Sequence, residues 1–160
     1  MQILALFVYG TLQQNQLRGR MWPHPPRSIE AAVTRGALYD LGSYPGILTG
    51  ADWVLGELWT LRPHHMDATL EALDAIEDYD SEEHSGLYLR IPITVYPEPA
   101  KRGQDPIQED RSVQAYTYFA NDPDLLSQAR RIPAEQSWHG MSVARWPDEL
   151  ARVPRFIAEE

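Results

Sequence analysis

The spacing of apolar and polar residues along this chain predicts five strands. An apolar run over residues 3–7 leads to Gly10, which indicates a first strand that runs into a tight turn. Runs rich in β-branched and aromatic residues predict the other four strands, at residues 31–41, 54–61, 87–96 and 112–119. The connections between them are polar or rich in glycine and proline, which is typical of turns and loops.

A different periodicity predicts one main helix at residues 63–78. Pro63 suits the first helical turn, and residues 64–78 contain no glycine or proline. Five strands around one main helix indicate a single α+β domain over residues 1–160, with a curled, mainly antiparallel sheet or small barrel. Two shorter helices are expected at 124–131 and 148–153, followed by a frayed tail.

Within the predicted helix, one carboxylate occupies an apolar position. Met66, Leu70 and Leu73 follow the i, i+4, i+7 spacing of a buried face. Glu77, at i+11, falls on the same face where another apolar residue would be expected. A buried and unpaired carboxylate costs on the order of several kcal/mol, so this position requires an explanation.

Two interpretations of Glu77 remain open at this point. In the first, its side chain reaches water at the end of the helix or pairs with Arg90 or Arg62. In the second, desolvation raises the pKa of Glu77 toward neutrality and makes it a proton shuttle.

Composition narrows the classes of function. The 160 residues are 43% hydrophobic and 23% charged, which is typical of a globular protein. A formal net charge of −9 argues against non-specific binding to nucleic acid or to anionic membranes. No apolar stretch approaches the roughly 20 residues that span a bilayer. The first residues lack the features of a secretory signal, so a cytoplasmic location is expected.

The residue types also limit the chemistry. The chain contains no cysteine, which excludes disulfides, a thiol nucleophile and thiolate-based metal sites. The histidines are scattered without the spacing of metal ligands, so no metal site is expected; they are His24, His64, His65, His84 and His139.

Five motifs occur in an order that resembles the gamma-glutamylcyclotransferase superfamily, in its AIG2-like branch, which includes gamma-glutamylamine cyclotransferase. They are Val8-Tyr9-Gly10-Thr11-Leu12, residues 36–46, Gly56-Glu57-Leu58, Leu73-Asp74-Ala75-Ile76-Glu77 and Tyr88-Leu89-Arg90. The resemblance covers residues 7–119, and residues 120–160 have no recognisable counterpart.

The resemblance implies a small mixed, mainly antiparallel barrel with flanking helices. It also implies an enzyme that cyclises a small gamma-glutamyl amine or peptide to 5-oxoproline and releases the amine, without metal or organic cofactor. Tyr9, Gly10, Thr11 and Leu12 would form the loop whose backbone holds the gamma-glutamyl group. Glu77 would be the catalytic acid/base, the residue that the helical periodicity also selects.

One position departs from the family pattern. Many relatives have glycine after the catalytic glutamate, whereas this chain has Asp78. If the helix ends there, this second carboxylate could enter the site and raise the pKa of Glu77 further.

Other polar residues have competing interpretations. Arg90 is expected to form a structural ion pair with Glu57 rather than to bind substrate. Tyr116 and Tyr118 share a strand face and either line the pocket or pack in the core.

Three functions are compatible with these residues. The first is the cyclotransferase; the second is a non-catalytic module that binds a small molecule or partner in the family cavity. The third keeps the chemistry but removes a gamma-glutamyl protecting group from a biosynthetic intermediate. The first and third share one glutamyl pocket and differ in the leaving group, and no motif specifies an oligomeric state.

Overall fold

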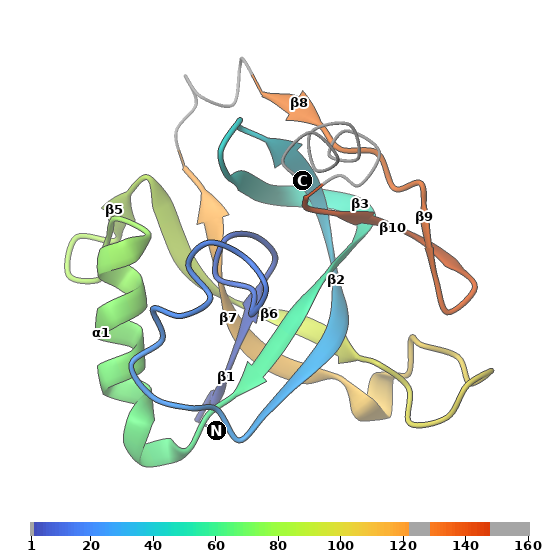
Figure 1. The fold of residues 1–160 in the computed structure, drawn as a ribbon, viewed down its shortest axis with the longest axis horizontal. Helices are drawn as coiled ribbons and strands as arrows, with labels where there is room; N and C mark the ends of the chain where they lie inside the picture. Colours follow the sequence, from blue (N-terminus) through green and yellow to red (C-terminus); the bar gives the residue numbers. More distant parts are fainter. Residues whose placement is uncertain (1, 122–128, 148–160) are drawn as a thin grey trace, which may run out of the picture.

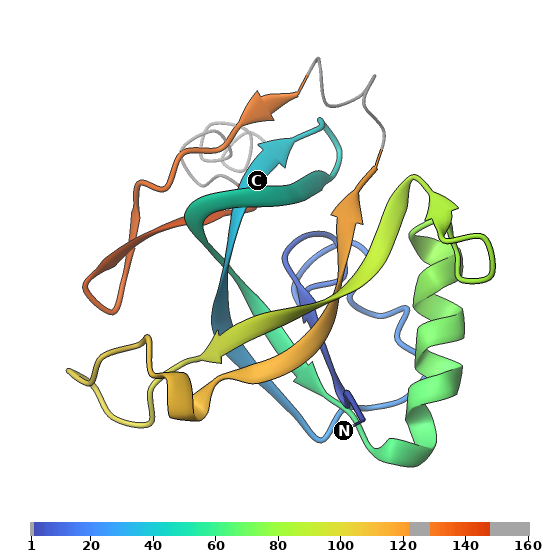
Figure 2. The same cartoon turned by 180° about the vertical axis from the view of Figure 1, so that it is seen from behind.

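The computed structural model describes residues 2–121 and 129–147, and its centre is a closed barrel of five strands. They are β1 (Ala5–Val8), β2 (Ser28–Asp40), β3 (Pro45–Thr60), β6 (Tyr88–Pro97) and β7 (Val113–Ala120). Four pairings are antiparallel: β1 with β3, β3 with β2, β2 with β6, and β6 with β7. A parallel pairing of β7 with β1 closes the ring, as Figures 1 and 2 show. The predicted mixed, mainly antiparallel barrel is therefore confirmed.

Short elements extend the barrel at its edges. Strand β8 (Arg130–Arg131) pairs with β2, and β10 (Met141–Arg145) pairs with β3 and with β9 (Gln136–Trp138). Strands β4 (Tyr79–Asp80) and β5 (Ser85–Gly86) form a separate hairpin. A 3₁₀ turn, η2 (Glu109–Arg111), precedes β7.

The helix α1 (Met66–Ile76) lies against one flank of the barrel in both views (Figures 1 and 2). It follows a 3₁₀ turn, η1 (Pro63–His65), so the predicted helix over 63–78 divides into two kinds of helix and ends two residues early. Asp78 takes a left-handed φ of 54°, which stops the helix. Within the described residues, no helix is long and apolar enough to cross a membrane.

Two predicted boundaries are wrong for identifiable reasons. Strand β3 begins at Pro45 rather than at residue 54, because residues 45–48, which locally resemble a turn, pair with the end of β2 beyond a shift in register. Arg130 and Arg131 belong to β8 rather than to the predicted helix 124–131, since they pair with β2. The remaining predicted helical positions, 124–128 and 148–153, lie outside the described residues, as does the predicted frayed tail.

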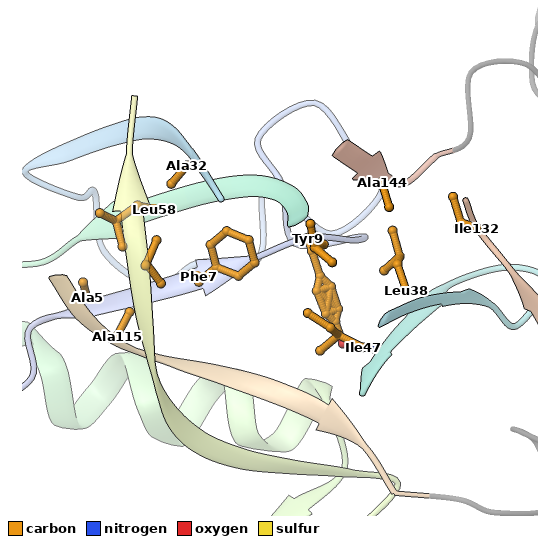
Figure 3. Packing of buried hydrophobic residues seen from close by; sticks show 12 residues of the cluster. Ala5, Phe7, Tyr9, Ala32, Leu38, Ile47, Leu58, Ala115, Ile132 and Ala144 are labelled. Atoms are coloured by element: carbon orange, nitrogen blue, oxygen red, sulfur yellow. Dashed lines mark hydrogen bonds between the residues drawn. The ribbon is translucent and has the colours of Figure 1, made fainter. Parts of the chain in front are cut away.

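Strand β1 is buried on both faces. Phe7 belongs to the cluster that fills the barrel, which Figure 3 shows together with Tyr9 and Leu58. Leu6 and Val8 point the other way, into a second cluster that contains residues of α1. This two-sided burial explains why the first strand is an unbroken apolar run rather than an alternating one.

Leu73 anchors α1 to the barrel. Its side chain is 0% exposed and belongs to the cluster that β1 shares with the helix. We expect Leu73→Ala to lower the free energy of unfolding by about 2–5 kcal/mol, because it leaves a cavity under the helix. Urea unfolding measures this, with Glu71→Ala on the exposed face of the same helix as the control, expected to change stability by less than about 0.5 kcal/mol. Equal effects of the two substitutions would show that α1 is not docked this way.

Candidate active site

A cavity of about 130 Å³ opens where the end of β1 meets the end of α1. Its walls come from the turn after β1, the start of β3, the C-terminal end of α1 and strands β6 and β7. Tyr9, Gly10, Thr11, Leu12 and Glu77 all line it. The structure therefore brings together all five residues that the sequence selected, although Leu12 and Glu77 are 65 positions apart in the chain.

The Tyr9 hydroxyl fixes the turn to the strands around it. It donates a hydrogen bond of 2.6 Å to the backbone carbonyl of Tyr118 and accepts one of 3.2 Å from the backbone N–H of Ile47. Burial is the main reason that the pKa of Tyr9 is raised well above its usual value. The neutral Tyr9 side chain therefore links the end of β1 to β3 and β7 at the cavity wall.

Gly10 is required because the side-chain ring of Pro45 packs against its backbone. A Cβ atom at this position would lie 2.6 Å from Cγ of Pro45, at the start of β3. The glycine therefore lets the turn and β3 form adjacent walls of the cavity.

The turn leaves backbone donors beside the cavity. The carbonyl of Gly10 accepts from the backbone of Gln13, and the carbonyl of Thr11 accepts from that of Arg18. Within the described part of the chain, the N–H groups of Thr11 and Leu12 donate to no protein acceptor. Two such donors on consecutive residues can bind a carboxylate or a developing oxyanion.

Glu77 occupies the C-terminal cap of α1, where its backbone N–H still bonds to the carbonyl of Leu73. Burial raises the pKa of its carboxyl group from 4.5 to about 7, and the positive charge of Arg18 acts in the opposite direction. Neither predicted cation pairs with it, because Arg90 binds Asp74 and Arg62 contacts the carbonyl of Pro25. The Glu77 carboxyl group is thus poised to exchange a proton near neutral pH.

The expected pairing of Arg90 with Glu57 is wrong. Arg90 Nη1 lies 2.7 Å from Oδ2 and 3.0 Å from Oδ1 of Asp74, one helical turn before Glu77. Glu57 instead accepts hydrogen bonds from Gln14 and Trp59. The sequence could not separate these acids, because strand alternation gives the side of β6 on which Arg90 lies but not which helix residue covers it.

Tyr118 and Tyr116 have different roles. Tyr118 lines the cavity, and its hydroxyl donates a hydrogen bond of 2.7 Å to Oδ1 of Asp74. Tyr116 is outside the lining and packs its ring 5.2 Å from the guanidinium of Arg90. These contacts connect α1, which ends next to Glu77, to strands β6 and β7 through Asp74.

Asp78 does not enter the cavity. It is exposed and absent from the lining, and its left-handed backbone is a conformation that glycine favours and aspartate tolerates. Asp78 therefore adopts the backbone conformation that a glycine at this position would favour, and its carboxylate stays outside the cavity.

The histidines are less scattered than the sequence indicates. His24 stacks on His65 at 4.0 Å between ring centroids, and His64 lies 4.1 Å from the same ring. Among residues 2–121 and 129–147, no group of three or more His, Asp or Glu side chains is placed to hold a metal ion.

Sequence reasoning missed several residues of the cavity, of which Arg18 is the most important. Arg18 comes from the irregular connection between β1 and β2, where no periodicity predicts which side chains face inward. Tyr44, Leu87 and Tyr88 also line the cavity. Tyr44 and Tyr88 lie inside motifs of the family resemblance, which is the one signal that could have found them.

The raised pKa of Glu77 makes stability depend on pH. Between about pH 4.5 and 7 the folded chain keeps a proton that the unfolded chain loses, so the contribution of Glu77 is full below pH 4.5 and is lost as the pH rises to 7. The groups that face the Glu77 carboxyl group are the guanidinium of Arg18 and the hydroxyls of three tyrosines, Tyr9, Tyr88 and Tyr118. The pKa values of the three tyrosines are raised, so these side chains stay neutral between pH 4.5 and pH 7.

We expect the stability of Glu77→Gln relative to wild type to increase by about 2 kcal/mol when the pH is raised from 5 to 8. The reason is that wild type loses the stabilising proton of Glu77 over this range, whereas glutamine has no proton to lose. Urea unfolding of both proteins at the two pH values measures this. Glu71→Gln, exposed on the same helix, is the control and should show no such gain. A stability difference between Glu77→Gln and wild type that is the same at both pH values would contradict a raised pKa.

Several known proteins are similar to this chain. A Vibrio cholerae protein that carries gamma-glutamylcyclotransferase as a provisional name is 37% identical over 87 residues, which cover 48% of this chain and 64% of that protein. The gamma-glutamylcyclotransferase family protein YtfP of Escherichia coli K12 is 30% identical over 79 residues, covering 49% and 66%. The chain thus matches just under two thirds of the length of these relatives.

Similarity of fold extends further than similarity of sequence. The crystal structure of an AIG2-like protein from Mus musculus superposes with a TM-score of 0.54 at 23% identity, over 92% of this chain and 99% of that one. A solution structure from Arabidopsis thaliana gives a TM-score of 0.53 at 20% identity, over 99% and 89%. Residues 6–140 match the sequence profile of one family, and the chain therefore belongs to the family described as gamma-glutamyl cyclotransferase, AIG2-like.

Proposed function

We propose that this protein cyclises a gamma-glutamyl compound to 5-oxoproline and releases the attached amine or amino acid, with Glu77 as general acid/base. The observation that carries the proposal is the position of the Glu77 carboxyl group, with a pKa of about 7, in the same small cavity as the turn 9–12. Family membership supports this reaction class, and the cavity lining includes an acid and a turn with two backbone donors of the kind that the reaction needs.

The substrate provides its own nucleophile. Its α-ammonium gives a proton to the Glu77 carboxylate, and the free amine then attacks the γ-carbonyl carbon to close a five-membered ring. The carbonyl oxygen becomes an oxyanion, which the N–H groups of Thr11 and Leu12 stabilise. The bond from this carbon to the leaving nitrogen then breaks, and Glu77 returns the proton to that nitrogen. After the attack the ring nitrogen still carries one extra proton, which passes to the departing amine, so the products are a neutral lactam and an ammonium ion. No covalent intermediate with the protein forms.

The shape of the cavity contributes to the rate by limiting the conformations of the substrate. A glutamyl chain has several rotatable bonds, and the small cavity holds it folded with its amine near its own carbonyl. The part of the wall that contains Tyr118 is kept in place by the contact of Tyr118 with Asp74 and of Asp74 with Arg90. These residues act by positioning and do not touch the reacting atoms.

We expect Glu77→Gln to fold and to bind substrate but to lose at least about a hundredfold in kcat, because an amide cannot accept the ammonium proton. The assay incubates the purified protein with gamma-glutamyl amines, gamma-glutamyl dipeptides and glutathione and measures 5-oxoproline. Asp78→Asn is the matched control, since it removes the neighbouring carboxylate outside the cavity and should keep activity within about twofold. A folded and active Glu77→Gln protein would refute the assignment, and a blank wild type across the panel would favour a non-catalytic binding module.

The pH dependence of turnover gives an independent test. Glu77 must be ionised to accept the proton, so we expect kcat to rise about tenfold per pH unit at low pH and to level off above about pH 7. Steady-state rates between pH 5 and pH 9 with a saturating substrate measure this profile. A rate that stays constant from pH 5 to pH 8 would exclude a carboxyl group with this pKa as the base.

A further inference from the structure

Arg18 is a cation on the cavity wall whose hydrogen bonding is almost unused. Within the described residues, its guanidinium makes one hydrogen bond, a long one of 3.4 Å from Nη1 to the carbonyl of Ile76. A guanidinium has five N–H donors, and within the described part of the chain no carboxylate lies within 4.0 Å of this one. The remaining donors are available to a ligand.

Glu77 does not take up this charge. Arg18 is near enough to lower the pKa of the Glu77 carboxyl group, yet the two side chains form no ion pair. The backbone carbonyl groups at the C-terminal end of α1 attract a cation electrostatically, which accounts for the position of Arg18. This attraction does not use the remaining N–H donors of the guanidinium.

Burial places Arg18 at the mouth of the cavity. The inner wall contains Tyr9 and Tyr118, which are 6% and 4% exposed. The outer wall contains Leu87, which is 39% exposed, and Arg18 itself is half-buried beside Leu17, which is 85% exposed. A gamma-glutamyl group that reacts within itself belongs in the enclosed part, and the leaving group then extends toward the mouth.

We propose that Arg18 binds a carboxylate on the leaving group and so makes this protein selective for gamma-glutamyl amino acids and peptides over simple gamma-glutamyl amines. The inference rests on the proposed function for the orientation of the substrate. A carboxylate can receive two parallel N–H bonds from one guanidinium, which gives both affinity and geometric selection. Arg18 is in this view a specificity residue, and Glu77 carries the chemistry.

Two ligands that differ by one group provide the test. Gamma-glutamylalanine and gamma-glutamylethylamine are alike except for the leaving-group carboxylate. Their affinities are measured by calorimetry in the Glu77→Gln protein, which does not turn them over, with and without Arg18→Gln. We expect Arg18→Gln to weaken gamma-glutamylalanine about tenfold and gamma-glutamylethylamine less than about twofold. Arg18→Lys should restore part of the loss.

Controls separate this role from a structural one. Arg20→Gln removes an exposed arginine from the same loop outside the cavity lining and should affect neither ligand. If Arg18 only stabilises the end of α1, Arg18→Gln lowers the unfolding midpoint but leaves the ratio of the two affinities unchanged. That unchanged ratio overturns the proposal, as does an equal loss for both ligands, which would assign Arg18 to the glutamyl group.

The binding measurements also distinguish the two proposals. If wild type binds both ligands but releases no 5-oxoproline, the catalytic proposal fails, while the affinity ratio still decides the role of Arg18. If wild type is active and Arg18→Gln lowers kcat/KM equally for both ligands, the cyclotransferase stands and the specificity proposal fails. If neither ligand binds, both proposals are overturned.

Discussion

Burial of β1 on both of its faces is the constraint on which the site depends. Phe7 packs into the barrel while Leu6 and Val8 pack against the cluster that contains Leu73 of α1. Because the helix is held against the outside of β1, its C-terminal end lies next to the turn that follows this strand. The hydrophobic effect that docks α1 therefore also brings Glu77 to Thr11 and Leu12.

The cavity combines groups that would be costly to bury separately. The Glu77 carboxyl group loses hydration, which raises its pKa to about 7, and the half-buried Arg18 limits that rise. Tyr9, Tyr88 and Tyr118 stay neutral because burial raises their pKa values. One acid, one cation and neutral hydroxyl groups therefore line a site in which the Glu77 carboxyl group gains or loses a proton near neutral pH.

Neighbouring contacts keep this arrangement rigid. Asp74 lies on α1, the helix whose C-terminal cap is Glu77. Its carboxylate binds Arg90 of β6 and Tyr118 of β7, and these contacts attach the end of the helix to the barrel. The Tyr9 hydroxyl joins β1 to β3 and β7. The contact between Gly10 and the Pro45 ring leaves no space for a side chain at position 10. These contacts fix the inner walls of the cavity to the barrel, whereas Arg18 comes from the irregular connection between β1 and β2.

The sequence by itself determined the α+β class, the main helix and the position of Glu77, because periodicity records which face of an element is buried. It could not determine that β3 starts at Pro45, since pairing with β2 overrides local turn chemistry. It also gave the wrong partner for Arg90, and it did not identify Arg18 at all. Only the tertiary structure decided these contacts, because residues from an irregular loop and from separate elements meet through packing that no local pattern encodes.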